Sequence, residues 1–248
     1  MKSLSAALLG VALTCLAAAV PAQAQNLSDP ESAFKGNERT KTWHAEVERT
    51  ERGHLIGNPD ADAALIEFVS YTCSHCASFA REGEGALDLA VLAPGLMSVE
   101  VRPVIRNGLD LAVSLLVQCG DPSGFKARHR MFLFSQDTWL TKASSAPQSQ
   151  RAMWARGDRN ARLNAARALD LDDMLANRGM SLPDINACLL DDAAAKELVD
   201  NAHADASEFG VPGTPSFALD GELLADVHSW DALYPVLEER FRPKRGNS

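Results

Sequence analysis

The sequence predicts an α/β fold in which a helical segment interrupts the core. Near the start of the core, two short runs with strand character flank a helix-compatible segment. Between residues 107 and 195 apolar residues recur mainly at helical spacing, and strand signals are few. Strand signals return near the C-terminus around Asp220-Gly221, a dipeptide typical of two-residue hairpins. This order predicts a sheet assembled from both ends of the chain, with a helical insertion between them.

Residues 1–24 have the features of a secretory signal peptide. Lys2 precedes an apolar stretch over 6–20, which is too short for a membrane span, and Ala22-Gln23-Ala24 forms a cleavage motif. A membrane anchor or a buried helix is the alternative, and Cys15 is a weaker candidate for lipid attachment. Cleavage would leave four cysteines, an even number that suits disulfide chemistry in an exported protein: Cys73, Cys76, Cys119 and Cys188.

The composition excludes several classes of function. The chain of 248 residues carries a formal net charge of −9, which argues against nucleic acid and anionic membrane surfaces as partners. We find no glycine-rich phosphate loop, no Ser/His/Asp constellation and no metal-ligand spacing among the histidines. We therefore expect no cofactor and no metal.

A polar N-terminal arm is expected over 25–52, although positions 43–50 alternate loosely and could form a strand. The first part of the α/β core is expected over 53–106. Its elements are a strand at 65–71, a helix at 76–92 and a second strand at 97–104. Gly83 and Gly85 weaken the middle of that helix.

The helical insertion is expected over 107–195, and the second part of the core over 196–248. Helices are predicted in the insertion at 125–134, 161–169, 171–177 and 183–190, with a loop at 142–150. Two strands and a closing helix are predicted after it, at 216–219, 223–227 and 231–240. Trp139 is expected in the core, whereas His129 lies in a basic run and is expected to face solvent.

The motif Cys73-Ser74-His75-Cys76 carries the chemistry. It lies between a strand and a helix, so Cys73 is expected at a helix N-terminus, where backbone N–H groups stabilise a thiolate. A low-pKa thiolate beside a partner cysteine is typical of thiol–disulfide oxidoreductases. We predict that Cys73 is the attacking thiol and Cys76 the resolving thiol. His75 is predicted to stabilise the thiolate, with a solvated side chain as the alternative, and Ser74 could cap the helix.

Glu67 is the unusual residue of the first predicted strand, because its neighbours Ile66 and Phe68 are apolar. Burial there would raise the pKa of its carboxyl group. We predict that it accepts a proton from Cys76 or donates one to it. The alternative is a solvent-facing position on an edge strand.

Thr214-Pro215 lies directly before a predicted strand. Only bonds preceding proline adopt the cis form at low cost. A cis bond here would turn the Thr214 backbone outward, where it could pair with an extended substrate strand. An ordinary trans proline that ends a loop is the alternative, but the earlier Cys-x-x-Cys motif favours the cis form.

Together these residues resemble the DsbA family of exported thiol oxidases, which have a thioredoxin-like fold with an inserted helical domain. The similarity covers residues 53–241: the segment 67–76 is similar to the family's strand-to-active-site pattern, and 210–215 to its cis-proline loop. The resemblance implies that Cys73 is the nucleophile, Cys76 the resolving thiol and His75 the thiolate stabiliser. It also implies that Glu67 is the buried carboxylate and Thr214-Pro215 the substrate-facing pair. Ser74 departs from the family's strongest oxidants, which carry proline at that position.

Cys119 and Cys188 both lie in the helical segment, at the ends of amphipathic stretches. We predict a structural disulfide between them, with two buried thiols as the alternative. A redox role that tunes the active pair is a third possibility. Some members of the family that the chain resembles carry such a second pair in the helical domain.

The leading hypothesis is a periplasmic monomer that donates the Cys73–Cys76 disulfide to paired thiols of exported proteins. The resemblance implies a membrane quinone-linked reoxidase as its partner. A reductase or isomerase is the nearest alternative, although related isomerases usually carry a dimerisation domain, for which the 17 polar residues 25–41 are too short. A metal-binding module built on Cys73, Cys76 and His75 is disfavoured, because a closed zinc site needs four ligands. A structural protein whose disulfide never turns over is also disfavoured.

Overall fold

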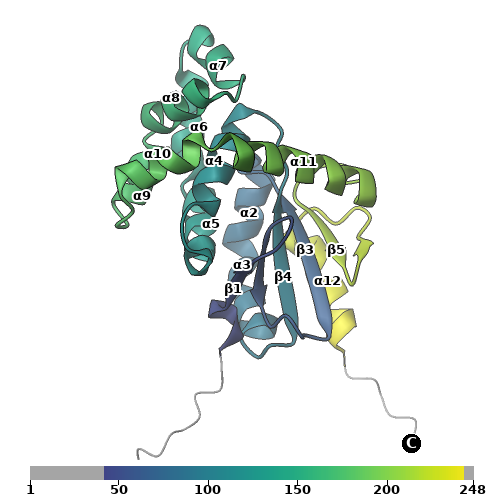
Figure 1. The fold of residues 1–248 in the computed structure, drawn as a ribbon. Coiled ribbons are helices and arrows are strands. Elements are labelled where there is room, and N and C mark those ends of the chain that lie inside the picture. Colours follow the sequence, from purple (N-terminus) through teal and green to yellow (C-terminus); the bar gives the residue numbers. More distant parts are fainter. Residues whose placement is uncertain (1–41, 243–248) are drawn as a thin grey trace, which may run out of the picture. The chain divides into compact units, whose positions relative to one another are not determined.

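A sheet of six strands forms the centre of the computed structural model, which describes residues 42–242 (Figure 1). The strands are β1 (Val47–Arg49), β2 (His54–Gly57), β3 (Ala63–Val69), β4 (Met97–Pro103), β5 (Ser216–Leu219) and β6 (Glu222–Leu223). Their order across the sheet is β1-β2-β4-β3-β5-β6. Only β3 and β4 run parallel among these pairs, and the other neighbours are antiparallel. The strand that leads into the active-site motif therefore lies inside the sheet, between β4 and β5.

The active-site helix and its continuation pack against one face of this sheet. The segment comprises α2 (Ser74–Glu82), α3 (Glu84–Leu87) and the π-helical turn η2 (Asp88–Leu92). The C-terminal helix α12 (Trp230–Phe241) lies beside α2, with the ring of Trp230 facing that of Phe79. Phe79 also packs on Phe217 of β5, so this face is joined to the sheet by aromatic contacts.

The opposite face is covered by α11 (Asp192–Phe209), which crosses in front of the strands in Figure 1. Phe68 of β3 packs on Phe209 of this helix, and Arg102 of β4 forms an ion pair with Asp205. Successive side chains of β3 thus pack against different helical layers, because side chains alternate between the two faces of a strand. Phe68 points toward α11, whereas Glu67 points toward the layer of the active-site helix.

A group of shorter helices follows β4. Figure 1 shows most of them gathered at the end of the sheet where α2 begins. Their bounds are α4 (Gly108–Gln118), η3 (Pro122–Gly124), α5 (Phe125–Phe134), α6 (Gln136–Ser145), α7 (Gln148–Trp154), α8 (Arg159–Ala168), α9 (Leu171–Ala176) and α10 (Leu182–Leu190). Side chains cap several of these helices: Ser181 accepts from the Asp184 N–H at the start of α10, for example.

The predicted fold class is confirmed: the protein is an α/β protein with a helical segment between the two parts of its sheet. The boundary expected after residue 195 falls inside α11, because that helix continues without interruption from the helical segment onto the sheet. The arm expected over 25–52 contains β1 and the 3-10 turn η1 (Trp43–Ala45) within its described part, because residues 47–49 pair with β2. The signal peptide predicted over 1–24 lies outside the described residues.

Three local predictions were wrong. Strand β2 was missed, since its four residues are too few to show a clear alternation. The loop expected over 142–150 is largely helical, because α6 and α7 extend into it from both sides. The last predicted strand is short, as β6 ends at Leu223. Trp139 is buried, as predicted, and within residues 42–242 no helix is both long and apolar enough to cross a bilayer.

Candidate active site

The Cys-x-x-Cys motif lies at the junction of β3 and α2. Cys73 has extended backbone angles and occupies the N-cap position of α2, so the free N–H groups of the first helical turn face its sulfur. Its side chain makes no capping hydrogen bond. The predicted capping role of Ser74 was wrong, because Ser74 is already the first residue of the helix.

Two buried residues of the helical segment hold the turn that carries Cys73. Asp110 of α4 accepts hydrogen bonds from the Thr72 backbone N–H at 2.9 Å and from the Ser70 hydroxyl at 2.8 Å. The amide of Gln136 in α6 donates to the carbonyl oxygens of Tyr71 and Cys73, at 2.8 and 2.9 Å. The inserted helices therefore fix the backbone of the active-site turn.

The sequence did not point to Asp110 or Gln136 as site residues. Both are polar residues at apolar helix positions, and both are fully buried. A buried polar side chain needs partners, so each marks a position where the helical segment contacts backbone groups. The helical spacing of the sequence places Asp110 and Gln136 at apolar positions, but it does not identify the turn to which their side chains bind.

The two thiols of the motif differ in acidity. The pKa of Cys73 is lowered to about 4, first by a hydrogen bond from the Cys76 thiol and further by Thr214 and the backbone N–H groups of Cys76 and His75. Burial raises the pKa of Cys76 well above its ordinary value, and the neighbouring Cys73 sulfur and Glu67 raise it further. Both cysteines are free thiols in this structure. At neutral pH the reduced site therefore holds a thiolate at Cys73 and a thiol at Cys76.

The loop before β5 faces Cys73. The Thr214–Pro215 peptide bond is cis, and the Cys73 sulfur lies 3.0 Å from the Thr214 carbonyl oxygen. Only the protonated thiol can donate to that carbonyl, so the contact belongs to the thiol form. The buried Thr214 hydroxyl has no hydrogen-bond partner among the described residues, and it is a donor for the thiolate form.

A groove of about 500 Å³ opens beside the cysteine and the cis-proline loop. Its lining includes Cys73, His75 and Thr214, and also Ala202 and Asp205 of α11. The His75 side chain is exposed at the edge of this groove, and its backbone N–H lowers the pKa of Cys73. Only 6% of the Cys73 surface is exposed, but Cys76 is fully buried, so Cys73 is the cysteine that another thiol or disulfide in the groove would meet.

Glu67 is buried, as expected from its apolar neighbours, and only 2% of its surface is exposed. Burial raises the pKa of its carboxyl group to about 8, nearby Glu84 raises it as well, and the nearby His129 lowers it. One carboxyl oxygen, Oε1, has no hydrogen-bond partner within the described part of the chain. Glu67 also acts electrostatically on Cys76, which brings the carboxyl and the resolving thiol into one site.

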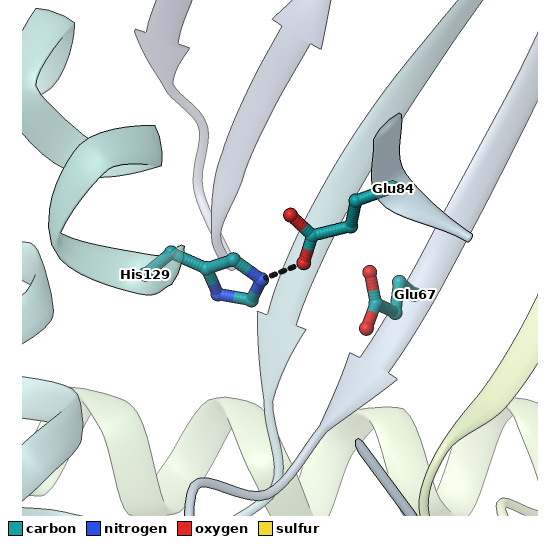
Figure 2. A group of neighbouring side chains, drawn as sticks. All are labelled: Glu67, Glu84 and His129. Atoms are coloured by element: carbon teal, nitrogen blue, oxygen red, sulfur yellow. Dashed lines mark hydrogen bonds and ion pairs between the residues drawn. The ribbon is translucent and has the colours of Figure 1, made fainter. Parts of the chain in front are cut away.

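The expectation that His129 faces solvent was wrong. His129 is 2% exposed, because it lies on the inner face of α5 with Phe125 and Phe132, which are four residues before and three residues after it. Its Nε2 lies 2.9 Å from Glu84 (Figure 2). Its Nδ1 lies 2.9 Å from the Tyr71 hydroxyl. The helical spacing could have predicted this burial, but the basic neighbours obscured it.

Glu67, Glu84 and His129 form a cluster of possible metal ligands, since one atom from each lies within 4.8 Å of the others. Glu84 and His129 are already bonded to each other, and Arg130 binds the second oxygen of Glu84 at 2.6 Å. These hydrogen bonds between side chains account for the positions of Glu84 and His129 without a metal.

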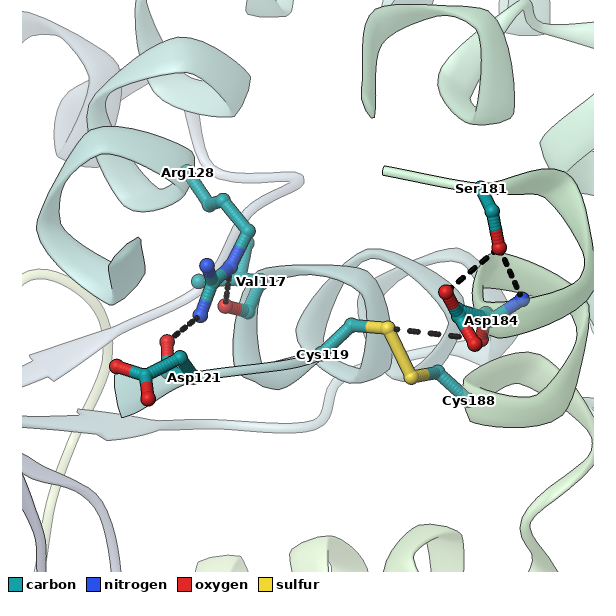
Figure 3. The surroundings of a disulfide bond; sticks show 7 residues. All are labelled: Val117, Cys119, Asp121, Arg128, Ser181, Asp184 and Cys188. Atoms are coloured by element: carbon teal, nitrogen blue, oxygen red, sulfur yellow. Dashed lines mark hydrogen bonds between the residues drawn. A yellow bond between two sulfur atoms is a disulfide. The ribbon is translucent and has the colours of Figure 1, made fainter. Parts of the chain in front are cut away.

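Cys119 and Cys188 are joined by a disulfide that links the end of α4 to α10 (Figure 3). Arg128 braces the same end of α4, since its guanidinium donates to the carbonyl oxygens of Val117 and Asp121. The disulfide and the arginine both tie the chain that leaves α4 to other helices. Neither contacts the Cys73–Cys76 pair directly.

Comparisons with known proteins agree with this geometry. A family model described as thioredoxin matches residues 49–239. A protein-disulfide isomerase from Novosphingobium aromaticivorans is 37% identical, and its structure superposes with a TM-score of 0.75 over 77% of this chain and 99% of that chain. The α-DsbA1 protein of Wolbachia pipientis is 18% identical, with a TM-score of 0.60 over 75% of this chain and 88% of that chain, and therefore shares the fold.

The curated relatives are longer than this chain. A candidate protein-disulfide oxidoreductase of Rickettsia conorii is 26% identical over 80% of this chain. The match spans 64% of that relative, and 62% of a similar protein from Rickettsia bellii. The chain thus spans less than two thirds of the length of these relatives.

Proposed function

The chain belongs to the thioredoxin family, and we propose that it is a protein-disulfide oxidoreductase that donates the Cys73–Cys76 disulfide to paired thiols. The observation that carries this proposal is the asymmetric cysteine pair. Cys73 has a pKa lowered to about 4 at the wall of an open groove, whereas Cys76 is buried with a raised pKa. Cys73 is 6% exposed and Cys76 is fully buried, so an attacking thiol would reach the pair at Cys73, as thiol–disulfide exchange needs.

The reaction starts from the oxidised enzyme. A substrate thiolate attacks the Cys73 sulfur, the Cys73–Cys76 bond breaks, and Cys76 leaves with the electron pair and takes up a proton. The second substrate thiolate then attacks the substrate sulfur of the mixed disulfide, and Cys73 leaves as a thiolate. The substrate loses two electrons and gains a disulfide, and the enzyme is left reduced.

The low pKa of Cys73 favours the oxidase direction. A stabilised thiolate lowers the free energy of the reduced enzyme relative to the oxidised enzyme. It also makes Cys73 the better leaving group when the mixed disulfide resolves. The equilibrium with an ordinary dithiol therefore shifts toward the reduced enzyme and the oxidised substrate.

The groove gives the substrate its binding site in this proposal. An extended substrate segment would pair with the backbone of Thr214 before Pro215 and place its cysteine beside Cys73. The substrates would be exported proteins with free thiols, and the site of action the periplasm, as the predicted signal peptide suggests. Turnover requires an electron acceptor, for which we propose a membrane quinone-linked reoxidase, and the active form would be a monomer.

A disulfide isomerase is the second candidate, supported by the name of the Novosphingobium protein, which is 37% identical to this chain. An isomerase works with its cysteine pair reduced and needs a reductant, whereas an oxidase works with the pair oxidised. The cysteine arrangement suits both reactions. The difference lies in the reduction potential of the pair and in the partner that maintains it.

The reduction potential of Cys73–Cys76 separates the two candidates. Purified protein would be equilibrated in glutathione buffers and its thiols trapped by alkylation, with a C119S/C188S variant as control. We expect a potential near −120 mV, on the order of strong dithiol oxidants. A value near −270 mV, on the order of thioredoxin, would contradict the oxidase assignment and favour a reductase or isomerase.

A further inference from the structure

A polar cluster lies beneath the active site, and the disulfide chemistry described above does not use all of it. Its members are Glu67 of β3, Glu84 of α3 and His129 of α5, all buried (Figure 2). Glu84 and His129 satisfy each other at 2.9 Å, but Oε1 of Glu67 has no partner among the described residues. An unpaired carboxyl oxygen in the core is costly, so this position calls for a ligand or a proton.

A small cavity adjoins the unpaired carboxyl. Its volume is about 20 Å³, enough for one water molecule and too small for a substrate. Its polar lining consists of Glu67, Glu84, His129, Asp88 and Lys126, and the rest of the wall is apolar. The polar groups of this lining could supply a single water with the two to four partners that an internal water needs.

The cluster leads from the core toward solvent. Asp88 and Lys126 form an ion pair at 2.5 Å at the outer side of the cavity, where their side chains are 13% and 15% exposed. Arg130 binds both Glu84 and Asp88 and is itself 29% exposed. The inner end is Glu67, which acts electrostatically on Cys76.

Charged and titratable groups surround His129 on every side. They come from five packed segments and comprise Glu67 and Tyr71 around β3, Glu84 of α3, Asp88 of η2, Lys126 and Arg130 of α5, and His54 of β2. Burial lowers the pKa of His129, but Glu84 and Glu67 outweigh it and the net pKa is raised. The imidazole can therefore carry a proton in the core while its two nitrogens are held by Glu84 and Tyr71.

We propose that the Glu84–His129 pair, with one water in the adjoining cavity, relays protons between solvent and Glu67, which exchanges them with Cys76. The proposal deepens the proposed function and rests on it. His129 and Glu84 act through Glu67, so they are positioning residues rather than catalytic ones. The relay has an inner end at the Cys76 sulfur and an outer end at the Asp88–Lys126 pair.

The proton balance of each turnover requires a proton donor and acceptor for Cys76. When substrate attacks Cys73, the Cys76 sulfur gains the electron pair of the broken bond and takes a proton from Glu67, which becomes a carboxylate. Glu67 then regains a proton from the water, and the Glu84–His129 pair passes the replacement proton in from solvent. Reoxidation of the enzyme runs the same path backwards: Cys76 gives its proton to Glu67 as it attacks the mixed disulfide at Cys73.

The test compares rates with equilibria in purified protein. The rate of reduction of the oxidised enzyme by dithiothreitol and the rate of oxidation of the reduced enzyme by glutathione disulfide are measured from pH 5 to 9. The variants are H129Q and E84Q, which remove the relay groups. The matched control is H54Q, because His54 is a second buried histidine that stacks on Phe125, the ring that also stacks on His129.

A proton relay changes the rates of reduction and oxidation, but it does not change the equilibrium between the reduced and oxidised enzyme. We expect both rates of H129Q and E84Q to fall about tenfold or more at pH 7, within the range of general acid–base effects, with a much smaller change in the glutathione equilibrium. The inflection of the wild-type pH profile near pH 8, the pKa of Glu67, should shift in both variants. H54Q should keep the wild-type rates and profile.

Folded H129Q and E84Q with wild-type rates and pH profiles would overturn the relay. If neither variant folds, the rates of the wild-type protein are compared in H₂O and D₂O, where absence of a solvent isotope effect on both directions overturns it. A wild-type protein that exchanges with neither reagent would refute the proposed function instead. The two failures are therefore distinguishable.

Discussion

The sulfur of Cys73 lies 3.0 Å from the carbonyl oxygen of Thr214, although the two residues are 141 positions apart. The contact joins the first and second parts of the α/β core, because Cys73 directly precedes α2 and Thr214 precedes β5. It also sets the chemistry of the site. Loss of the thiol proton removes the donor from this contact, so the thiolate must be stabilised by other groups.

The first prediction concerns that thiolate. In the reduced protein the absorbance of thiolate at 240 nm should titrate with a midpoint near pH 4, the pKa of Cys73. The Cys76→Ala variant should raise this midpoint, because the Cys76 thiol supplies the largest stabilising hydrogen bond. A midpoint that is the same in C76A would show that the helix N-terminus, rather than Cys76, determines the acidity.

The Thr214 hydroxyl provides a second, independent test of how the Cys73 thiolate is stabilised. Thr214→Val keeps the β-branched shape and the backbone carbonyl but removes the buried hydroxyl, which lowers the pKa of Cys73. We expect the 240 nm midpoint to rise in T214V while the protein remains folded, as judged by circular dichroism. Ser216, whose hydroxyl donates to the Gly213 carbonyl in the same loop, provides the matched control as Ser216→Ala. An equal rise in both variants would assign the effect to the loop rather than to the hydroxyl.

The stability of the reduced protein should depend on pH in a direction that the Cys73 pKa fixes. The folded pKa of about 4 lies below the unfolded value, so the thiolate stabilises the fold fully above the unfolded pKa. This contribution is lost progressively as the pH falls toward 4, by at most about 1.4 kcal/mol per pH unit. The measurement is urea unfolding of the reduced and oxidised forms from pH 4 to 9.

The oxidised form is the internal control in that experiment, because its Cys73 does not titrate. The buried carboxyls Glu67 and Asp110, whose pKa values are raised, are present in both forms. The difference in unfolding free energy between the forms should therefore isolate the cysteine. Parallel pH curves for the two forms would contradict a strongly lowered pKa for Cys73.

The sequence was sufficient to predict the part of the site that is local in the chain. The strand, the Cys-x-x-Cys motif and the helix are consecutive, so residues 65–82 could be assigned from periodicity and from the motif alone. Glu67 could be predicted as buried because its strand neighbours are apolar. The Thr214-Pro215 loop could be linked to the cysteines only through the resemblance to a known family.

Residues that reach the site from the inserted helices could not be predicted in this way. Asp110 and Gln136 bind backbone groups of the active-site turn, and no sequence pattern identifies which backbone a buried polar side chain will meet. His129 was assigned to solvent because its neighbours are basic. Its burial follows from the packing of α5 against β2 and α3, where His54 stacks on Phe125 and Glu84 bonds to His129.

The Cys119–Cys188 disulfide should contribute to stability without changing the active site. It closes a loop with a sequence separation of 69 residues, for which the chain-entropy model gives about 4 kcal/mol. We expect urea unfolding of C119S/C188S to show a loss of up to that size and an unchanged 240 nm titration of Cys73. A shifted titration midpoint would instead indicate that the bridge tunes the active pair.

Gly83 and Gly85 provide the last prediction, because the two glycines of one helical segment have opposite surroundings. A Cβ atom on Gly83 would lie 2.7 Å from the ring of Trp230, whereas a Cβ on Gly85 would meet nothing within 4 Å. Gly83 is therefore required for the close approach of α12 to α2, and its φ angle of −105° gives alanine no backbone penalty. We expect Gly83→Ala to lower the free energy of unfolding by about 1–3 kcal/mol through overpacking.

Gly85→Ala should leave stability unchanged or raise it by up to about 1 kcal/mol, since alanine favours a helix over glycine. Urea unfolding followed by circular dichroism measures both variants. If the sequence-based view that both glycines only loosen the helix were correct, both alanine variants would be stabilised. Destabilisation of G83A alone would show that the first glycine is a packing residue between the active-site helix and the C-terminal helix.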